Sequence, residues 1–223
     1  MFLHKQDANG LHAVGTGGQM TVLNSSDYIT HVKPNQEQTL DFLRLLYGDA
    51  APGYLTIWTP DKVTGVFSAS DLSSAAAYVA QQAKTQNVYF GVGLQAEPPT
   101  GTSRGDAAGV GAIGGLWVDL DIGTEGHKKP GIPTLDDALD LLGEDGFPAP
   151  TVIIDTGHGL HAYWLFTQPW VFQDADDRAA AAAMVKRLQA IIRTKAEARG
   201  WNVDSTHDLA RLLRPAGTVN RKG

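Results

Sequence analysis

Residues 115–123 read GLWVDLDIG, and this stretch decides how the rest of the chain is interpreted. Its apolar residues predict a buried strand, which Asp119 and Asp121 interrupt. Side chains two residues apart on a strand point to the same face, about 7 Å apart along the chain. Two unpaired buried carboxylates are costly, and a divalent cation removes that cost. The alternative is a pair of aspartates at a strand end that face solvent or pair with arginine.

A second pattern lies in residues 151–166, TVIIDTGHGLHAYWLF, which predict two strands joined by a glycine-rich turn. Gly157 and Gly159 let the backbone turn tightly, and amides in such a turn bind phosphate oxygens. His161 begins the second strand, where its imidazole suits a phosphate or a metal-bound group. The alternative is a hairpin that contains a structural histidine.

The third pattern is VDSTHDLARLLRPAGTVNRK, residues 203–222. Asp204 is a candidate for a third carboxylate at the same site, and Asp208 competes with it for that role. Arg211 and Arg214 lie three residues apart in an apolar stretch, and arginine suits bidentate contacts with phosphate. The alternative is an ion pair between Asp208 and one of these arginines.

Together, and in this order, the three patterns resemble the archaeo-eukaryotic primase superfamily, most closely the bifunctional primase-polymerases of phages and plasmids. The resemblance spans about residues 85–222. It implies an α+β (α/β) fold in which an RRM-like catalytic sheet packs with a smaller N-terminal α/β unit. We therefore expect a single catalytic domain over residues 1–223, with an N-terminal subregion of about 1–95 and a catalytic subregion of about 96–223.

The resemblance also implies a reaction, which is template-directed nucleotidyl transfer by a DNA primase-polymerase using two Mg²⁺ or Mn²⁺ ions. It assigns metal binding to three carboxylates, Asp119, Asp121 and Asp204, with Asp208 as competitor for the last, and it assigns catalysis to these three aspartates and His161. It assigns nucleotide and phosphate contacts to a histidine, two glycines and three basic residues: His161, Gly157, Gly159, Arg211, Arg214 and Lys222.

A single-stranded template requires a basic groove and stacking aromatic side chains. Three basic residues in predicted loops are candidates for template contacts: Arg104, Lys128 and Lys129. We expect the partners to be single-stranded DNA and NTPs or dNTPs. The chain stops directly after a strongly patterned segment, which suggests a helicase that follows it or acts beside it.

Composition excludes several classes of protein. The 223 residues contain no Cys, which rules out a disulfide framework, a thiolate zinc site and a cysteine nucleophile. No apolar run reaches the roughly 18 residues of a membrane span, so we expect a cytoplasmic protein of a bacterial or phage-infected cell. The net charge is −6, yet residues 186–223 carry nine basic residues against three acidic ones, a pattern that can mark a polyanion site.

Periodicity and turn residues predict helices and strands in alternation. The expected helices are 38–48, 71–85, 135–143 and 174–199. The expected strands are 53–58, 87–94, 115–122, 151–155 and 160–166, with one or two more within 201–214. A long loop is expected over 95–112, and residues 1–35 are expected to form an arm or an edge strand.

Two other functions stay open. A rolling-circle replication initiator endonuclease shares the RRM-like core, but it needs a His-hydrophobic-His motif and a helical Tyr nucleophile. His158 and His161 have two residues between them, and residues 174–199 contain no Tyr. The other alternative is a non-catalytic RRM-like nucleic-acid-binding module, against which the overall acidity and the absence of an RNA-stacking motif both argue.

Overall fold

The computed structural model describes residues 21–24, 34–62, 64–123, 131–144 and 148–221. The helices are α1 (Gln36–Tyr47), α2 (Leu72–Gln82), α3 (Leu135–Leu142) and α4 (Ala175–Ala198). The strands are β1 (Thr21–Asn24), β2 (Tyr54–Trp58), β3 (Thr64–Ser68), β4 (Tyr89–Gly91), β5 (Gly93–Gln95), β6 (Val110–Asp121), β7 (Val152–Asp155), β8 (Gly159–Val171) and β9 (Leu212–Leu213).

Each of the four helices begins at a polar residue whose side chain accepts a hydrogen bond from an amide of the first turn. These residues are Asn35, Asp71, Thr134 and Asp174. Such caps satisfy amides that have no partner within the helix. The local sequence therefore fixes where each helix starts.

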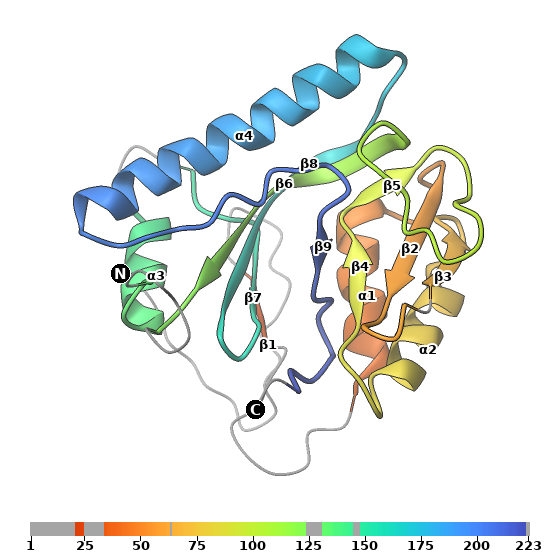
Figure 1. Ribbon diagram of the computed structural model, residues 1–223, viewed down its shortest axis with the longest axis horizontal. Coiled ribbons are helices and arrows are strands. Elements are labelled where there is room, and N and C mark those ends of the chain that lie inside the picture. Colours follow the sequence, from red (N-terminus) through yellow and green to blue (C-terminus); the bar gives the residue numbers. More distant parts are fainter. Residues whose placement is uncertain (1–20, 25–33, 63, 124–130, 145–147, 222–223) are drawn as a thin grey trace.

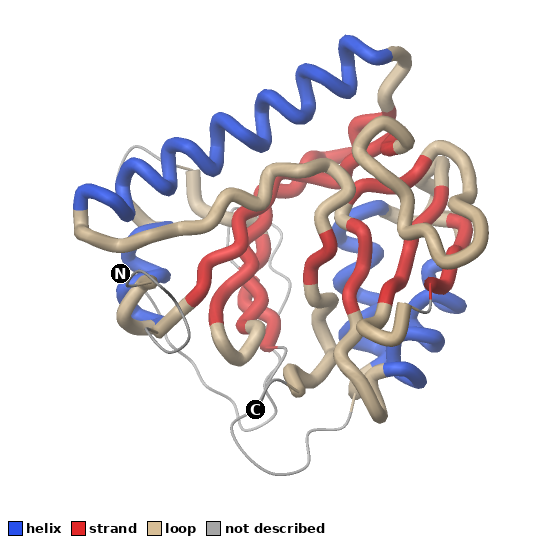
Figure 2. Tube along the Cα trace, in the orientation of Figure 1, coloured by secondary structure: helices blue, strands red, loops and turns tan. Residues whose placement is uncertain are grey.

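The strands form one nine-stranded sheet in the order β1-β7-β8-β6-β5-β2-β4-β9, with β3 on the other edge of β2. β4 and β5 are successive parts of one extended stretch that breaks at Val92. β6 pairs with β5, whereas β9 pairs with β4, and the Val92 amide donates to the Arg211 carbonyl. The sheet therefore forks here, and β6 and β9 diverge on either side of the fork (Figures 1 and 2).

Two hydrophobic cores hold the layers together. The larger one packs α1 and α2 against β2, β4, β5 and one face of β6–β8. The smaller one packs α3 and α4 against the opposite face of β6–β8. Gly114 allows the C-terminal turn of α1 to lie directly on β6, because a Cβ at this position would overlap the Leu46 carbonyl. The paired strands β6 and β8 are thus packed on both faces.

The predicted α+β class is confirmed, as are the four helices. Among the described residues, the short strand β1 pairs with β7 alone and lies at the end of the sheet order, as expected for an edge strand. Several details differ from expectation. β6 begins at Val110, inside the expected loop 95–112, the expected strand 87–94 is divided into β4 and β5, and β8 runs beyond residue 166 to Val171. Strand β3 was not predicted, and residues 201–211 form no strand. Backbone amides in that segment bond to side chains instead, Thr206 to Gln189 and Ala210 to Asp208.

None of the helices in the described ranges combines the length and apolar character needed to cross a bilayer.

Candidate active site

Asp119 lies at the centre of a small charged cluster at the fork of the sheet. It is the direct cross-strand partner of His161, whose Nε2 is 3.4 Å from Asp119 Oδ1. Arg211 reaches it from the segment that leads into β9, with Nη2 3.5 Å from Asp119 Oδ2. Asp121, two residues further along β6, is on the same face and is exposed. The structure therefore brings together three of the predicted site residues, Asp119, His161 and Arg211, and places Asp121 on the same face of β6.

The cluster keeps Asp119 ionised. Burial alone would raise its pKa, but His161 and then Arg211 more than offset that effect, so the pKa lies below its usual value. His161 is only 5% exposed. In the described part of the chain its Nδ1 has no hydrogen-bond partner, and neither does the buried Nε of Arg211. Buried polar atoms without partners are uncommon in native proteins, and a functional role is one explanation when they occur.

The turn between β7 and β8 lies beside this cluster. Gly157 adopts φ 85°, a conformation that favours glycine. Its amide donates to Asp155 Oδ1 at 2.7 Å, so this N–H is already used within the turn. A Cβ at Gly159 would overlap the Leu120 carbonyl, so this glycine permits the close pairing of β8 with β6. The structure thus explains Gly157 by turn geometry and Gly159 by strand pairing, and their predicted phosphate contacts stay predictions.

The two candidate third carboxylates lie on the segment between α4 and β9. Asp204 is exposed, and its Oδ1 accepts from Asn202 Nδ2 at 3.4 Å. Asp208 Oδ1 accepts from the Ala210 amide at 2.9 Å. Over the residues that the structure describes, no three His, Asp or Glu side chains lie close enough to bind one metal ion. The structure therefore does not bring Asp204 together with the carboxylates of β6, and its metal role stays a prediction.

Arg214 is buried and bonded to the chain itself. Its guanidinium donates to the Val219 carbonyl and to the side-chain oxygens of Asn87 and Asn220, at 3.0–3.1 Å. It also lies over the Tyr89 ring, 5.3 Å from the centroid. Burial lowers the pKa of Arg214, and Tyr89 partly offsets this. This geometry favours packing over the predicted phosphate contact.

The donor set on β6 fits a hard divalent cation. Carboxylate oxygens are the ligands that Mg²⁺ and Mn²⁺ prefer, and the two aspartates lie on one face of β6. Asp119 and Asp121 are thus the residues that would hold such an ion.

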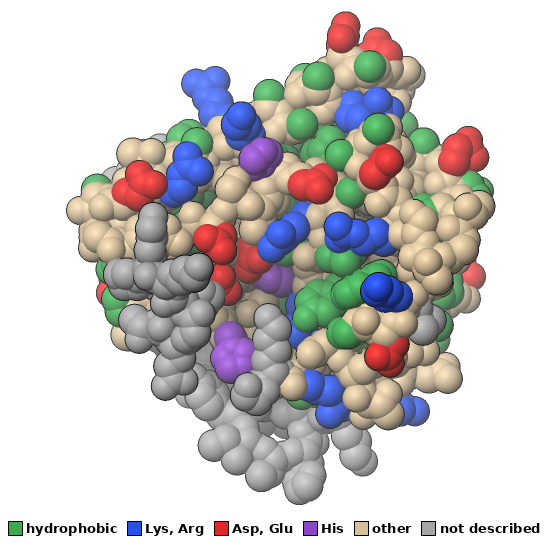
Figure 3. Space-filling model, viewed as in Figure 1, with side chains coloured by type: hydrophobic (Ala, Val, Ile, Leu, Met, Phe, Trp, Pro, Cys, Tyr) green, Lys and Arg blue, Asp and Glu red, His purple; other side chains and the backbone are tan. Residues whose placement is uncertain are grey.

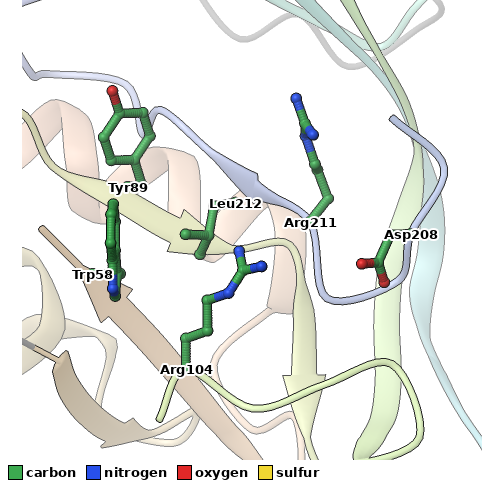
Figure 4. Close-up of a pocket in the computed structure, with 6 residues that line it drawn as sticks. All are labelled: Trp58, Tyr89, Arg104, Asp208, Arg211 and Leu212. Carbon is green, nitrogen blue, oxygen red and sulfur yellow. The ribbon is translucent and has the colours of Figure 1, made fainter. Parts of the chain in front are cut away.

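A pocket of about 260 Å³ lies next to the charged cluster, on the β4 and β9 side of the fork (Figure 4). Its lining contains two aromatic rings, two arginines, an aspartate and a leucine: Trp58, Tyr89, Arg104, Asp208, Arg211 and Leu212. On the surface, basic and acidic side chains meet in the middle of this face (Figure 3).

Sequence reasoning singled out Arg104, Asp208 and Arg211 but missed Trp58 and Tyr89. The missed pair had no local signal, because the two rings meet only through the pairing of β2 with β4. The other predicted basic residues, Lys128, Lys129 and Lys222, lie outside the described residues.

Comparisons with known proteins give one relevant likeness. No family model matches the chain, and no curated protein matches it. Among solved structures, the chain is similar to the AEP domain of the primase-polymerase (PrimPol) of cyanophage S-2L, with a TM-score of 0.54 and 22% sequence identity. The match covers 82% of this chain and 83% of that one. The chain thus has the fold of a phage primase-polymerase AEP domain.

Proposed function

We propose that the protein is a DNA primase-polymerase, which transfers nucleotides to a growing 3′-hydroxyl on single-stranded DNA. One observation carries this proposal. In a fold shared with a phage AEP domain, adjacent strands place Asp119 opposite His161, with Asp121 on the same face and Arg211 across the fork.

The charged cluster suits phosphate transfer because positioning and charge neutralisation supply most of the catalysis in such reactions. His161 has a buried nitrogen without a partner among the described residues, and we assign it to an oxygen of the incoming triphosphate. Arg211 neutralises Asp119 in the free protein. We infer that it turns to a phosphate oxygen once Asp119 has another positive partner.

We assign the metal-binding role to Asp119 and Asp121, with Asp204 or Asp208 as the candidate for a third ligand. A bound Mg²⁺ or Mn²⁺ supplies charge neutralisation at the phosphates and a lower pKa for the attacking hydroxyl. The native partners in this proposal are single-stranded DNA, NTPs or dNTPs, and a helicase. Its setting is the cytoplasm of a bacterial or phage-infected cell.

The test is incorporation of labelled NTPs and dNTPs on single-stranded DNA, with and without a primer, in Mg²⁺ or Mn²⁺. The parent protein is compared with Asp119→Ala/Asp121→Ala. Metal-assisted charge stabilisation is worth several kcal/mol, so we expect the double variant to lose about 100-fold or more in rate. Products made without a primer would establish priming as well as extension.

The matched control is Asp41→Ala/Asp140→Ala, which removes two exposed carboxylates from α1 and α3. Alanine is a good helix former, so this variant should fold and incorporate nucleotides like the parent. DNA binding by the folded parent without metal-dependent incorporation would contradict the proposal and favour the non-catalytic binding module. A covalent 5′-phosphotyrosyl adduct would favour the endonuclease.

A further inference from the structure

The aromatic pair of the pocket lies on the face of the sheet opposite the core that α1 and α2 share. Trp58 and Tyr89 are direct partners across the β2–β4 ladder, with ring centroids 6.0 Å apart and a tilt of 51°. Their neighbours Ile57 and Phe90 are fully buried in the core shared with α1 and α2. Since side chains alternate along a strand, the half-buried pair lies on the face turned away from these two helices (Figure 1).

Arg104 is brought to this pair by a loop that is fixed on both sides. Thr64 on β3 donates through Oγ1 to the Thr102 carbonyl at 3.1 Å. The buried Gln95 donates through Nε2 to the Asp106 carbonyl at 3.2 Å. Arg104 lies between these two anchors, and its guanidinium points into the pocket beside Leu212 (Figure 4).

Arg211 links the pocket to the candidate active site, because it lines the pocket and also lies 3.5 Å from Asp119. The lining has two arginines and the carboxylate of Asp208, and Arg211 also faces Asp119, so Arg104 is the basic side chain best placed to meet a phosphate. The pocket volume of about 260 Å³ is smaller than the roughly 300–1,000 Å³ of sites for whole drug-sized ligands. A space of this size suits one planar base better than a complete nucleoside triphosphate.

We propose that the pocket binds one nucleotide of the single-stranded DNA template, next to the reacting position. The base stacks on Trp58 with Tyr89 beside it, and Arg104 binds a phosphate of the strand. Aromatic rings that alternate with basic side chains are the usual means of holding single strands without reading their sequence. This inference rests on the proposed polymerase function and adds the place where the template lies.

The test is the equilibrium binding of a fluorescent oligothymidylate, measured by anisotropy in EDTA over a range of salt concentrations. Stacking of one base is worth about 1–3 kcal/mol, so Trp58→Leu should weaken binding about 5- to 160-fold. Its salt dependence should be unchanged, because no charge is lost. Trp58→Phe keeps a ring and should bind within about threefold of the parent.

Arg104→Gln, in contrast, should change the salt dependence of binding. Loss of one phosphate contact reduces the slope of log affinity against log salt by about 0.7 for a single strand.

Two matched controls should change neither affinity nor slope. Tyr78→Leu breaks a second tilted pair, with Phe67, whose centroids are 5.3 Å apart at the same 51°. Arg44→Gln removes an exposed arginine from α1.

Several results would overturn the inference. One is parental affinity in folded Trp58→Leu, as judged by an unchanged melting temperature. Another is a tenfold higher KM for the incoming nucleotide with unchanged DNA affinity, which would assign the pocket to the free nucleotide. If the parent incorporates nucleotides while Trp58→Leu binds DNA normally, only this inference fails. If the folded parent neither binds DNA nor incorporates nucleotides, the proposed function fails with it.

Discussion

Each carboxylate oxygen of Asp119 faces a basic side chain from a different part of the sequence, His161 on β8 and Arg211 before β9. The two contacts reach it from opposite sides of the fork. The pairing with His161 is set by the register of two long strands, whereas the contact with Arg211 depends on how the C-terminal segment crosses the sheet. At the scale of single residues, the site therefore combines a contact within the β6–β8 ladder with a contact from the C-terminal segment.

Asp155 gives a prediction about pH. Burial raises the pKa of Asp155, and the Gly157 amide and His158 only partly offset this. A carboxyl with a raised pKa stabilises the fold fully below its unfolded value of about 3.9, and this contribution is lost as the pH rises through the folded value. Asp155→Asn keeps the acceptor for Gly157 and cannot ionise. We expect it to be more stable than the parent at pH 7, with a gain that shrinks toward pH 4.

Urea unfolding at pH 7, 5 and 4 would measure this gain. Asp140→Asn, at an exposed position on α3, is the control and should show no such dependence. An advantage of Asp155→Asn that is equal at every pH would mean that packing, and not ionisation, is its cause.

At the scale of elements, the 96–109 loop depends on one glycine. Gly105 adopts φ 81°, and a Cβ there would overlap the amide of Gln95, which anchors the loop. Gly101 adopts φ 65° with open space around the Cβ position. Gly101→Ala should therefore cost only the left-handed conformation, about 1–2 kcal/mol. Gly105→Ala should cost at least about 1 kcal/mol more, because the Gln95 hydrogen bond is also lost.

Urea unfolding of both variants would measure the difference. Only Gly105→Ala should also weaken the binding of single-stranded DNA, since Arg104 is the adjacent residue. Equal stabilities for the two variants would show that Gln95 moves aside without cost.

The elements also show what sequence patterns can and cannot predict. Helices α1, α2, α3 and α4 were predictable because caps and apolar periodicity are local signals. The Asp119–His161 pair was predictable in part, since each residue stood out within its own strand. The meeting of Trp58 with Tyr89 was not, because alternation along a strand gives the face but not the partner. Asp204 stood out by pattern, yet the fold leaves it exposed beside Asn202.

At the scale of the whole molecule, the C-terminal segment joins the two sides of the fork. Trp117 Nε1 on β6 donates to the Thr206 carbonyl at 3.0 Å. Gln189 on α4 donates to the Trp117 carbonyl and accepts from the Thr206 amide. Further along, Asn220 donates to the Thr156 carbonyl in the β7–β8 turn. The segment that carries Arg211 is thus bonded to the rest of the molecule both before Arg211, at Thr206, and after it, at Asn220.

Gln189→Leu should destabilise the protein by removing both hydrogen bonds of the Gln189 side chain. The substitution leaves the Trp117 carbonyl and the Thr206 amide buried without a partner, and each such group costs about 1–3 kcal/mol. We expect a loss of about 2–6 kcal/mol in the free energy of unfolding, measured in urea. Gln81→Leu, at an exposed position on α2, is the control and should stay within about 0.5 kcal/mol of the parent.

The joining role of the C-terminal segment has a consequence for biosynthesis. Thr39, on the first helix after β1, bonds to the carbonyl of Ala216, 177 residues later. Contacts of this separation slow folding, because a long loop must close before they contribute. On the ribosome, α1 and α2 can pack early, but Arg211 and β9 reach the fork only after nearly the whole described chain has been synthesised. The nascent protein therefore completes its charged cluster last, and a product that stops before residue 211 lacks both Arg211 and β9.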